Sequence, residues 1–134
     1  MDPNFFWGYL WIGQAYVEKR MYKEAIAEIQ KAIALSPGNA RAIATLGYAF
    51  GVSGKRVEAQ RVLGELKEGS KQSYVSPYYF ALVYTGLGEK DHAFEWLEKA
   101  YEKGEIPGTI KVEPVFDSLH SDPRFADLLR RIGL

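Results

Sequence analysis

The fold is decided by residues 9–37, YLWIGQAYVEKRMYKEAIAEIQKAIALSP, whose pattern of residue types returns at 43–71 and again at 77–105. The later stretches read IATLGYAFGVSGKRVEAQRVLGELKEGSK and PYYFALVYTGLGEKDHAFEWLEKAYEKGE, and all three align without a gap. Four columns keep a period of 34 residues: Gly13, Gly47 and Ala81; Tyr16, Phe50 and Tyr84; Ala25, Ala59 and Ala93; Ile29, Leu63 and Leu97. Because a fixed period of about 20–50 residues is typical of repeat architectures, the sequence predicts a stack of similar units.

Each unit reads as two helices joined by a turn. In the first unit one apolar face is spaced at i, i+3, i+4 and i+7 and consists of Tyr9, Ile12, Gly13 and Tyr16. A second apolar face follows the turn at 19–22 and consists of Ala25, Ile29 and Ala32. The first of these faces is expected to pack inward against the second helix. The later units place Gly54 and Gly88 in the corresponding turns, where glycine suits the left-handed conformation that ends a helix.

Small residues recur where the two helices of a unit are expected to meet. Glycine within a helix costs about 1 kcal/mol relative to alanine, so its return at Gly13 and Gly47 indicates a steric demand. Ala25, Ala59 and Ala93 hold the matching place on the second helices. The sequence therefore predicts that the two backbones of a unit approach closely.

These residues carry a resemblance to a known family. A 34-residue helix–turn–helix unit with Ile/Leu-Gly-x-x-Tyr/Phe on its first helix, alanine on its second and proline at its end resembles the tetratricopeptide repeat. The second unit departs from the family pattern at Leu66, where alanine is favoured, and at Lys71, where proline is expected. The resemblance implies an all-α fold in one domain (1–134), a right-handed α-solenoid with units at about 6–39, 40–73 and 74–107 and a C-terminal cap at about 112–134.

The N-terminal residues extend the period backwards. Pro3 lies 34 residues before Pro37, so MDPN is expected to be the end of a preceding unit. Three origins stay open: an excised C-terminal piece of a longer array, which is the preferred interpretation, a natural start, and a designed sequence, against which the irregular second unit argues. In each case Phe5 and Phe6 are expected at the junction that a preceding unit would cover, because each repeat buries its sides against its neighbours.

The C-terminal segment is predicted to cap the array. Asp122 before Pro123 is a good helix start, since aspartate caps free amide groups and proline suits the first helical position. An apolar stripe follows, made of Phe125, Leu128, Leu129 and Ile132. This ending resembles the C-termini of bacterial multi-repeat proteins in which such arrays follow a signalling or regulatory domain, which implies a regulatory segment of a larger protein as one alternative.

The composition argues against several classes of partner. The 134 residues include 17 basic and 17 acidic side chains, so there is no net charge to attract nucleic acid. There is no cysteine, which suits a reducing compartment, and cytoplasm is the expected location. No apolar run is long enough to cross a membrane and the N-terminus lacks the pattern of a signal peptide, so membrane insertion is not expected.

No group of residues predicts catalysis, a metal site or a bound cofactor. His92 and His120 have no second ligand at metal-binding spacing, so structural or solvent-facing roles are expected for both. The stretch GVSGK at 51–55 lacks the spacing of a phosphate-binding loop and follows a predicted helix rather than a strand, so it is interpreted as the turn within the second unit. We therefore expect that the protein is not an enzyme.

The resemblance implies a concave surface lined by the first helix of each unit. The residues predicted there, and predicted to contact a peptide or partner, are Trp7, Leu10, Trp11, Gln14, Arg41, Thr45, Tyr48, Tyr78, Tyr79 and Leu82. Tryptophan and tyrosine are typical interface anchors. A clamp for acidic chain ends, which one subtype of the family builds from lysine, arginine and asparagine, is disfavoured because Arg41 is the lone cation near these positions.

The sequence therefore predicts a non-catalytic protein-interaction module, a scaffold that holds a peptide or partner domain in an aromatic groove. The alternative from another class is a self-assembling element that pairs through its exposed N-terminal face. The aromatic side chains also have a second interpretation, in which they pack between helices or on a neighbouring unit.

Overall fold

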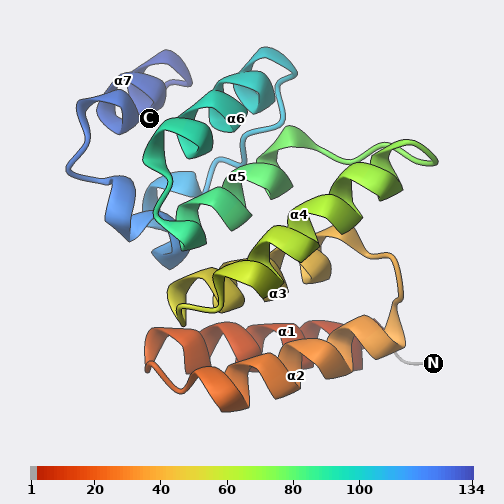
Figure 1. Cartoon of the computed structure of the whole chain (residues 1–134). Helices are drawn as coiled ribbons and strands as arrows, with labels where there is room; N and C mark the ends of the chain where they lie inside the picture. The colour runs from red at the N-terminus through yellow and green to blue at the C-terminus, as the bar shows by residue number, and fades with distance from the viewer. Residues whose placement is uncertain (1–2) are drawn as a thin grey trace.

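Three helix pairs follow one another in the computed structural model, which describes residues 3–134. The pairs are α1 (Pro3–Glu18) with α2 (Tyr22–Leu35), α3 (Ala40–Val52) with α4 (Arg56–Ser70), and α5 (Pro77–Leu87) with α6 (Lys90–Glu102). Two short 3-10 helices and a last α-helix follow: η1 (Ile110–Val112), η2 (Pro114–Leu119) and α7 (Pro123–Arg131). Figure 1 shows the pairs stacked in sequence order, with α7 beyond α6. This all-α arrangement confirms the predicted helical-repeat solenoid.

Side-chain caps and left-handed residues mark several helix ends, and the left-handed glycines are among those that the sequence predicted. Side-chain oxygens of Asn39 and Ser76 accept hydrogen bonds from the backbone amides that open α3 and α5. Gly54 and Gly88 are left-handed, with φ of 84° and 76°. The equivalent turn of the first unit holds Arg20, whose φ of 62° puts a side chain in a conformation that normally favours glycine.

The small residues lie where the helices of a unit meet, as predicted. A Cβ at Gly13 would lie 2.6 Å from Cγ1 of Ile29, and one at Gly47 would lie 2.8 Å from Cγ1 of Val62. Real Cβ atoms do not approach other atoms so closely, so a larger residue at either position would force these neighbouring side chains to shift.

The closest approach of two backbones occurs elsewhere, between α3 and α5. A Cβ at Gly86 would lie 2.6 Å from the carbonyl oxygen of Tyr48, and one at Gly51 would lie 2.5 Å from the carbonyl carbon of Gly86. These two glycines stand outside the columns that define the repeat. They let α5 pack directly on the backbone of α3, which fixes the position of Tyr48.

The buried face of α1 differs from the predicted one. Phe6, Leu10, Gly13 and Val17 are buried, whereas Ile12 is 48% exposed. Ile12 corresponds to Phe80 of the third unit, which is 3% exposed and belongs to a core cluster that includes Leu63 of the preceding helix pair. Within residues 3–134 no helix pair covers that side of α1, so the prediction that Ile12 packs inward is wrong.

The junction predicted at the N-terminus is corrected in two respects. Phe5 is 61% exposed, as a residue at an uncovered junction should be, but Phe6 is 7% exposed and belongs to the core. In addition, α1 begins at Pro3, so Pro3 and Asn4 are helical rather than part of a loop like that around Pro37. Met1 and Asp2, the other residues of this prediction, lie outside the described residues.

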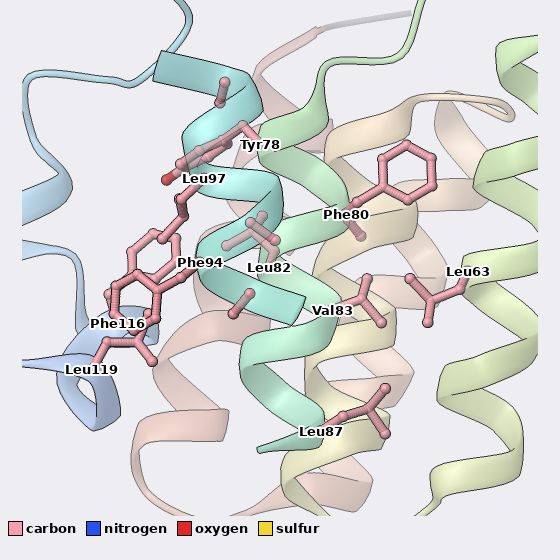
Figure 2. Close-up of a cluster of buried hydrophobic side chains, with 14 of the residues drawn as sticks. Leu63, Tyr78, Phe80, Leu82, Val83, Leu87, Phe94, Leu97, Phe116 and Leu119 are labelled. Atoms are coloured by element: carbon pink, nitrogen blue, oxygen red, sulfur yellow. The ribbon is translucent and has the colours of Figure 1, made fainter. Parts of the chain in front are cut away.

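The C-terminal segment does more than cap the last unit. The carboxylate of Asp122 accepts a hydrogen bond from the amide of Arg124 at 2.9 Å and starts α7, as predicted. Before that helix, Phe116 and Leu119 are fully buried in the core cluster shared with α5 and α6. Figure 2 shows both side chains pointing into this cluster. Because η2 packs on α5, the segment covers part of the face that the first helices of the units present.

Candidate functional site

A pocket of about 440 Å³ lies between α1, α3 and the start of η2, and we call it the α1–α3 pocket. Its apolar wall consists of Val17, Val52, Pro114 and Val115. Its polar lining includes Gln14, Thr45, Tyr22, Tyr48 and Arg20, with the carboxylates Glu18, Glu113 and Asp117. A concave, partly apolar pocket with a few polar groups is the usual form of a binding site.

Two valines stand at the α1–α3 pocket where the α3–α5 interface has glycines. Gly51 and Gly86 bring α3 and α5 into backbone contact, and the residues 34 positions earlier are Val17 and Val52. Both valines line the pocket, and α1 makes few direct contacts with α3. The bulkier side chains are consistent with the wider separation of the first two units on this face.

Two predicted binding residues form an exposed aromatic pair on α1, the helix that also contributes Gln14 to the pocket. The rings of Trp7 and Trp11 lie 6.1 Å apart between centroids, and Trp11 is 61% exposed. The guanidinium of Arg41 lies 5.6 Å from the ring of Trp7, within the range of a cation–π contact. Its Nε is buried and forms no hydrogen bond with any described residue. Arg41 therefore holds the Trp7 end of this surface in place.

The structure brings some of the other predicted residues together and buries the rest. Gln14 and Tyr48 line the pocket, and Tyr79 is half-buried. Four of the predicted positions are less than 9% exposed, although one of them, Thr45, also lines the pocket: Leu10, Thr45, Tyr78 and Leu82. A binding role for the exposed and half-buried residues stays a prediction.

The four buried positions have two physical causes. Leu10 joins the apolar cluster between the first two units, and the hydroxyl of Thr45 donates to the carbonyl of Arg41 at 2.7 Å, which satisfies it within α3. Tyr78 and Leu82 lie near the C-terminal segment, with the ring of Phe116 5.7 Å from that of Tyr78. The chain itself therefore occupies the part of the groove that α5 was predicted to offer.

Sequence reasoning missed the pocket residues that lie outside the repeated first helices. Glu113, Val115 and Asp117 come from a segment where the 34-residue period has already stopped. The available signal was the similarity of EPVFDSL to DPRFADLL, which marked Phe116 as a second apolar anchor like Phe125. That similarity indicates burial, but it does not indicate which face of the array the segment covers.

The electrostatics of the pocket favour neutral tyrosine. Burial, followed by the negative charge of Asp117 and smaller effects of Tyr22 and Glu18, raises the pKa of Tyr48 from 10.0 to about 12. Burial and the charge of Glu113 also raise the pKa of Tyr78, while Arg41 opposes this shift. The pocket therefore disfavours additional negative charge.

Alkaline pH is expected to weaken the fold through Tyr48. Because the folded pKa is raised, the neutral phenol stabilises the fold fully below its ordinary pKa, and this contribution is lost between about pH 10 and 12. The unfolding free energy of Tyr48→Phe should fall less steeply with pH over this range. The slopes of the two proteins should differ by at most the contribution of about one proton. Urea unfolding at a series of pH values measures the slope. Equal slopes in the two proteins would show that Tyr48 is not perturbed.

Residues 3–134 contain neither a metal-binding cluster nor a membrane-spanning helix. No three histidine, cysteine, aspartate or glutamate side chains there are grouped to hold a metal ion. None of the helices in that range has the length and apolar character needed to cross a membrane.

Comparison with known proteins gives one match. Residues 6–39, which form α1 and α2 with the turn that follows, match the family model described as tetratricopeptide repeat. A search of curated proteins and a search of solved structures found no match. Repeats of this family generally mediate protein–protein interaction, and proteins built from them are typically non-catalytic scaffolds.

Proposed function

We propose that this chain, whose residues 6–39 match the tetratricopeptide repeat, is a protein-interaction module that binds a peptide segment of a partner along α1 and in the α1–α3 pocket. The observation that carries the proposal is the exposed pair of Trp7 and Trp11 one to two helical turns from Gln14, a residue of the pocket. A large exposed aromatic surface beside a pocket is characteristic of interaction sites.

The arrangement suits a short peptide better than a large flat domain. The C-terminal segment covers the groove beside α5, so the accessible surface is confined to α1, α3 and the edge formed by residues 113–117. A non-catalytic role in the cytoplasm completes the proposal.

Trp11→Ala should weaken peptide binding by about thirtyfold, because truncation of an aromatic hot-spot residue costs about 2 kcal/mol of binding free energy. The ligand is a peptide selected from a random displayed library with the wild-type protein, and the affinity is measured by fluorescence anisotropy. Val57→Ala is the matched control, since Val57 is 66% exposed on α4. The proposal fails if no peptide is selected, or if both variants bind as well as the wild type.

A second candidate function is self-association through the uncovered side of α1. Phe5 and Ile12 lie seven residues apart on one face of the helix and are 61% and 48% exposed. The position equivalent to Ile12 in the third unit, Phe80, is buried against its neighbours. This surface therefore has the character of an inter-unit interface.

If this face pairs two copies, Ile12→Glu should shift the protein from dimer to monomer, because it places a charge in the centre of the apolar surface. Light scattering at increasing protein concentration measures the mass. Lys19→Glu, on an exposed residue beyond the end of α1, is the control and should leave the mass unchanged. A wild-type protein that stays monomeric at all concentrations rules out this candidate.

A further inference from the structure

Three carboxylates of the α1–α3 pocket lack a lysine or arginine partner. No ion pair between these residues and a lysine or arginine occurs within residues 3–134 for Glu18, Glu113 or Asp117. Arg20 also lines the pocket, and its charge offsets one of the three. The lining therefore keeps a negative balance in a protein whose net charge is zero.

The partners that these carboxylates do have leave them available. Glu113 accepts a hydrogen bond from the hydroxyl of Thr109 at 3.0 Å, and Asp117 lies 4.0 Å from Nε2 of His120. Carboxylates on the outer faces differ, because Asp91 pairs with Arg124 at 2.8 Å and Glu98 pairs with Arg131.

Beside the carboxylates the pocket is apolar. Val17 and Val52 line it from α1 and α3, and Val115 lines it from the C-terminal segment. A volume of about 440 Å³ holds a long side chain rather than a single ion. Lysine and arginine combine an aliphatic stem with a cationic head, and they commonly bury the stem while the head stays near water and charge. The lining has the two parts that such a side chain requires.

We propose that the α1–α3 pocket receives a lysine or arginine side chain of the bound peptide, with its stem on the valines and its cationic head among Glu18, Glu113 and Asp117. This inference rests on the proposed function and names the chemistry of the peptide at that site. Burial is the main cause of the raised pKa of Tyr48, and the negative charges of Asp117 and Glu18 add to it. The same two charges would favour a cationic side chain in the pocket.

The geometry of α1 sets the spacing in the peptide. Trp11, Gln14 and Glu18 share one helical face at i, i+3 and i+7, and the last two line the pocket. Seven residues of α-helix rise by about 10.5 Å, which an extended peptide spans in about three residues. The ligand is therefore an extended segment with an apolar side chain on Trp11 and a basic side chain about three residues away.

The first test is the composition of selected peptides. Selection from a random displayed library with the wild-type protein should enrich lysine or arginine about three residues from an apolar residue. The same selection with the Glu113→Gln, Asp117→Asn double variant should lose the basic residue and keep the apolar one. Enriched peptides without a basic residue, or with an acidic one, overturn this inference and leave the proposed function standing. If neither protein selects any peptide, the proposed function itself fails.

The second test places the basic residue in the pocket. Affinities of a selected peptide and its arginine-to-glutamine version are measured with wild type and with Glu113→Gln, which keeps an oxygen to accept from Thr109. Each change alone should weaken binding by about three- to tenfold. The two changes together should weaken binding little more than either change alone. Glu65→Gln, on an exposed residue of α4, is the control and should leave the affinity unchanged. Additive losses would mean that the basic residue binds elsewhere, which overturns the inference.

Discussion

Phe116→Ala should lower the free energy of unfolding by about 3–5 kcal/mol, the usual cost of removing a buried phenylalanine. Phe116 is completely buried, and its ring lies 5.7 Å from that of Tyr78 and 6.4 Å from that of Phe125. The side chain thus joins α5 to α7. Its loss leaves a cavity in the core and loosens the segment that supplies Glu113 and Asp117 to the pocket.

Chemical denaturation followed by circular dichroism measures this change. Val112→Ala provides the control, because Val112 belongs to the same segment but is 74% exposed. Its effect should stay within about 0.5 kcal/mol. A similar small effect for Phe116→Ala would show that the C-terminal segment is not part of the cooperative core.

Gly86→Ala should destabilise the protein by about 3 kcal/mol, at the upper end for overpacking a well-packed interior. The added Cβ would lie 2.6 Å from the carbonyl oxygen and 2.9 Å from the Cα of Tyr48. Both are backbone atoms, so no side chain can rotate away to relieve the contact. α3 and α5 must separate, which moves Tyr48 within the pocket and should weaken peptide binding as well.

Gly64→Ala is the matched control for this substitution. Gly64 lies within α4, and a Cβ there would meet no atom within 4 Å. The same chemical change should therefore stabilise the protein by about 0.5–1 kcal/mol, since alanine is the better helix former. Thermal or urea unfolding of both variants measures the difference. Effects of the same sign would contradict the close approach of α3 and α5.

The sequence could predict the helix pairs because their signals are local and repeated. The period of 34 residues, the glycines at 54 and 88 and the Asp122–Pro123 helix start each act within a few residues of where they occur. The aromatic pair of Trp7 and Trp11 was predicted for the same reason, because their spacing along one helix puts them on one face.

The remaining features of the site depend on contacts between units. The neighbours of α1 decide whether Leu10 or Ile12 is buried. The pattern of apolar residues within α1 is compatible with burial of either one. The wider separation of α1 from α3 is associated with Val17 and Val52, which stand where the α3–α5 interface has Gly51 and Gly86. These positions do not keep one residue type from unit to unit, so the repeat pattern does not reveal them. The return of residues 110–119 over α5 brings together residues more than 30 positions apart, which no local pattern encodes.

The structure of the protein in complex with a selected peptide tests the proposed interaction site most directly. The peptide should lie along α1, with an apolar side chain on Trp11 and the next anchor beside Tyr48 in the α1–α3 pocket. A peptide bound on the outer faces of α4 and α6, or on the Phe5 and Ile12 side of α1, would contradict this proposal.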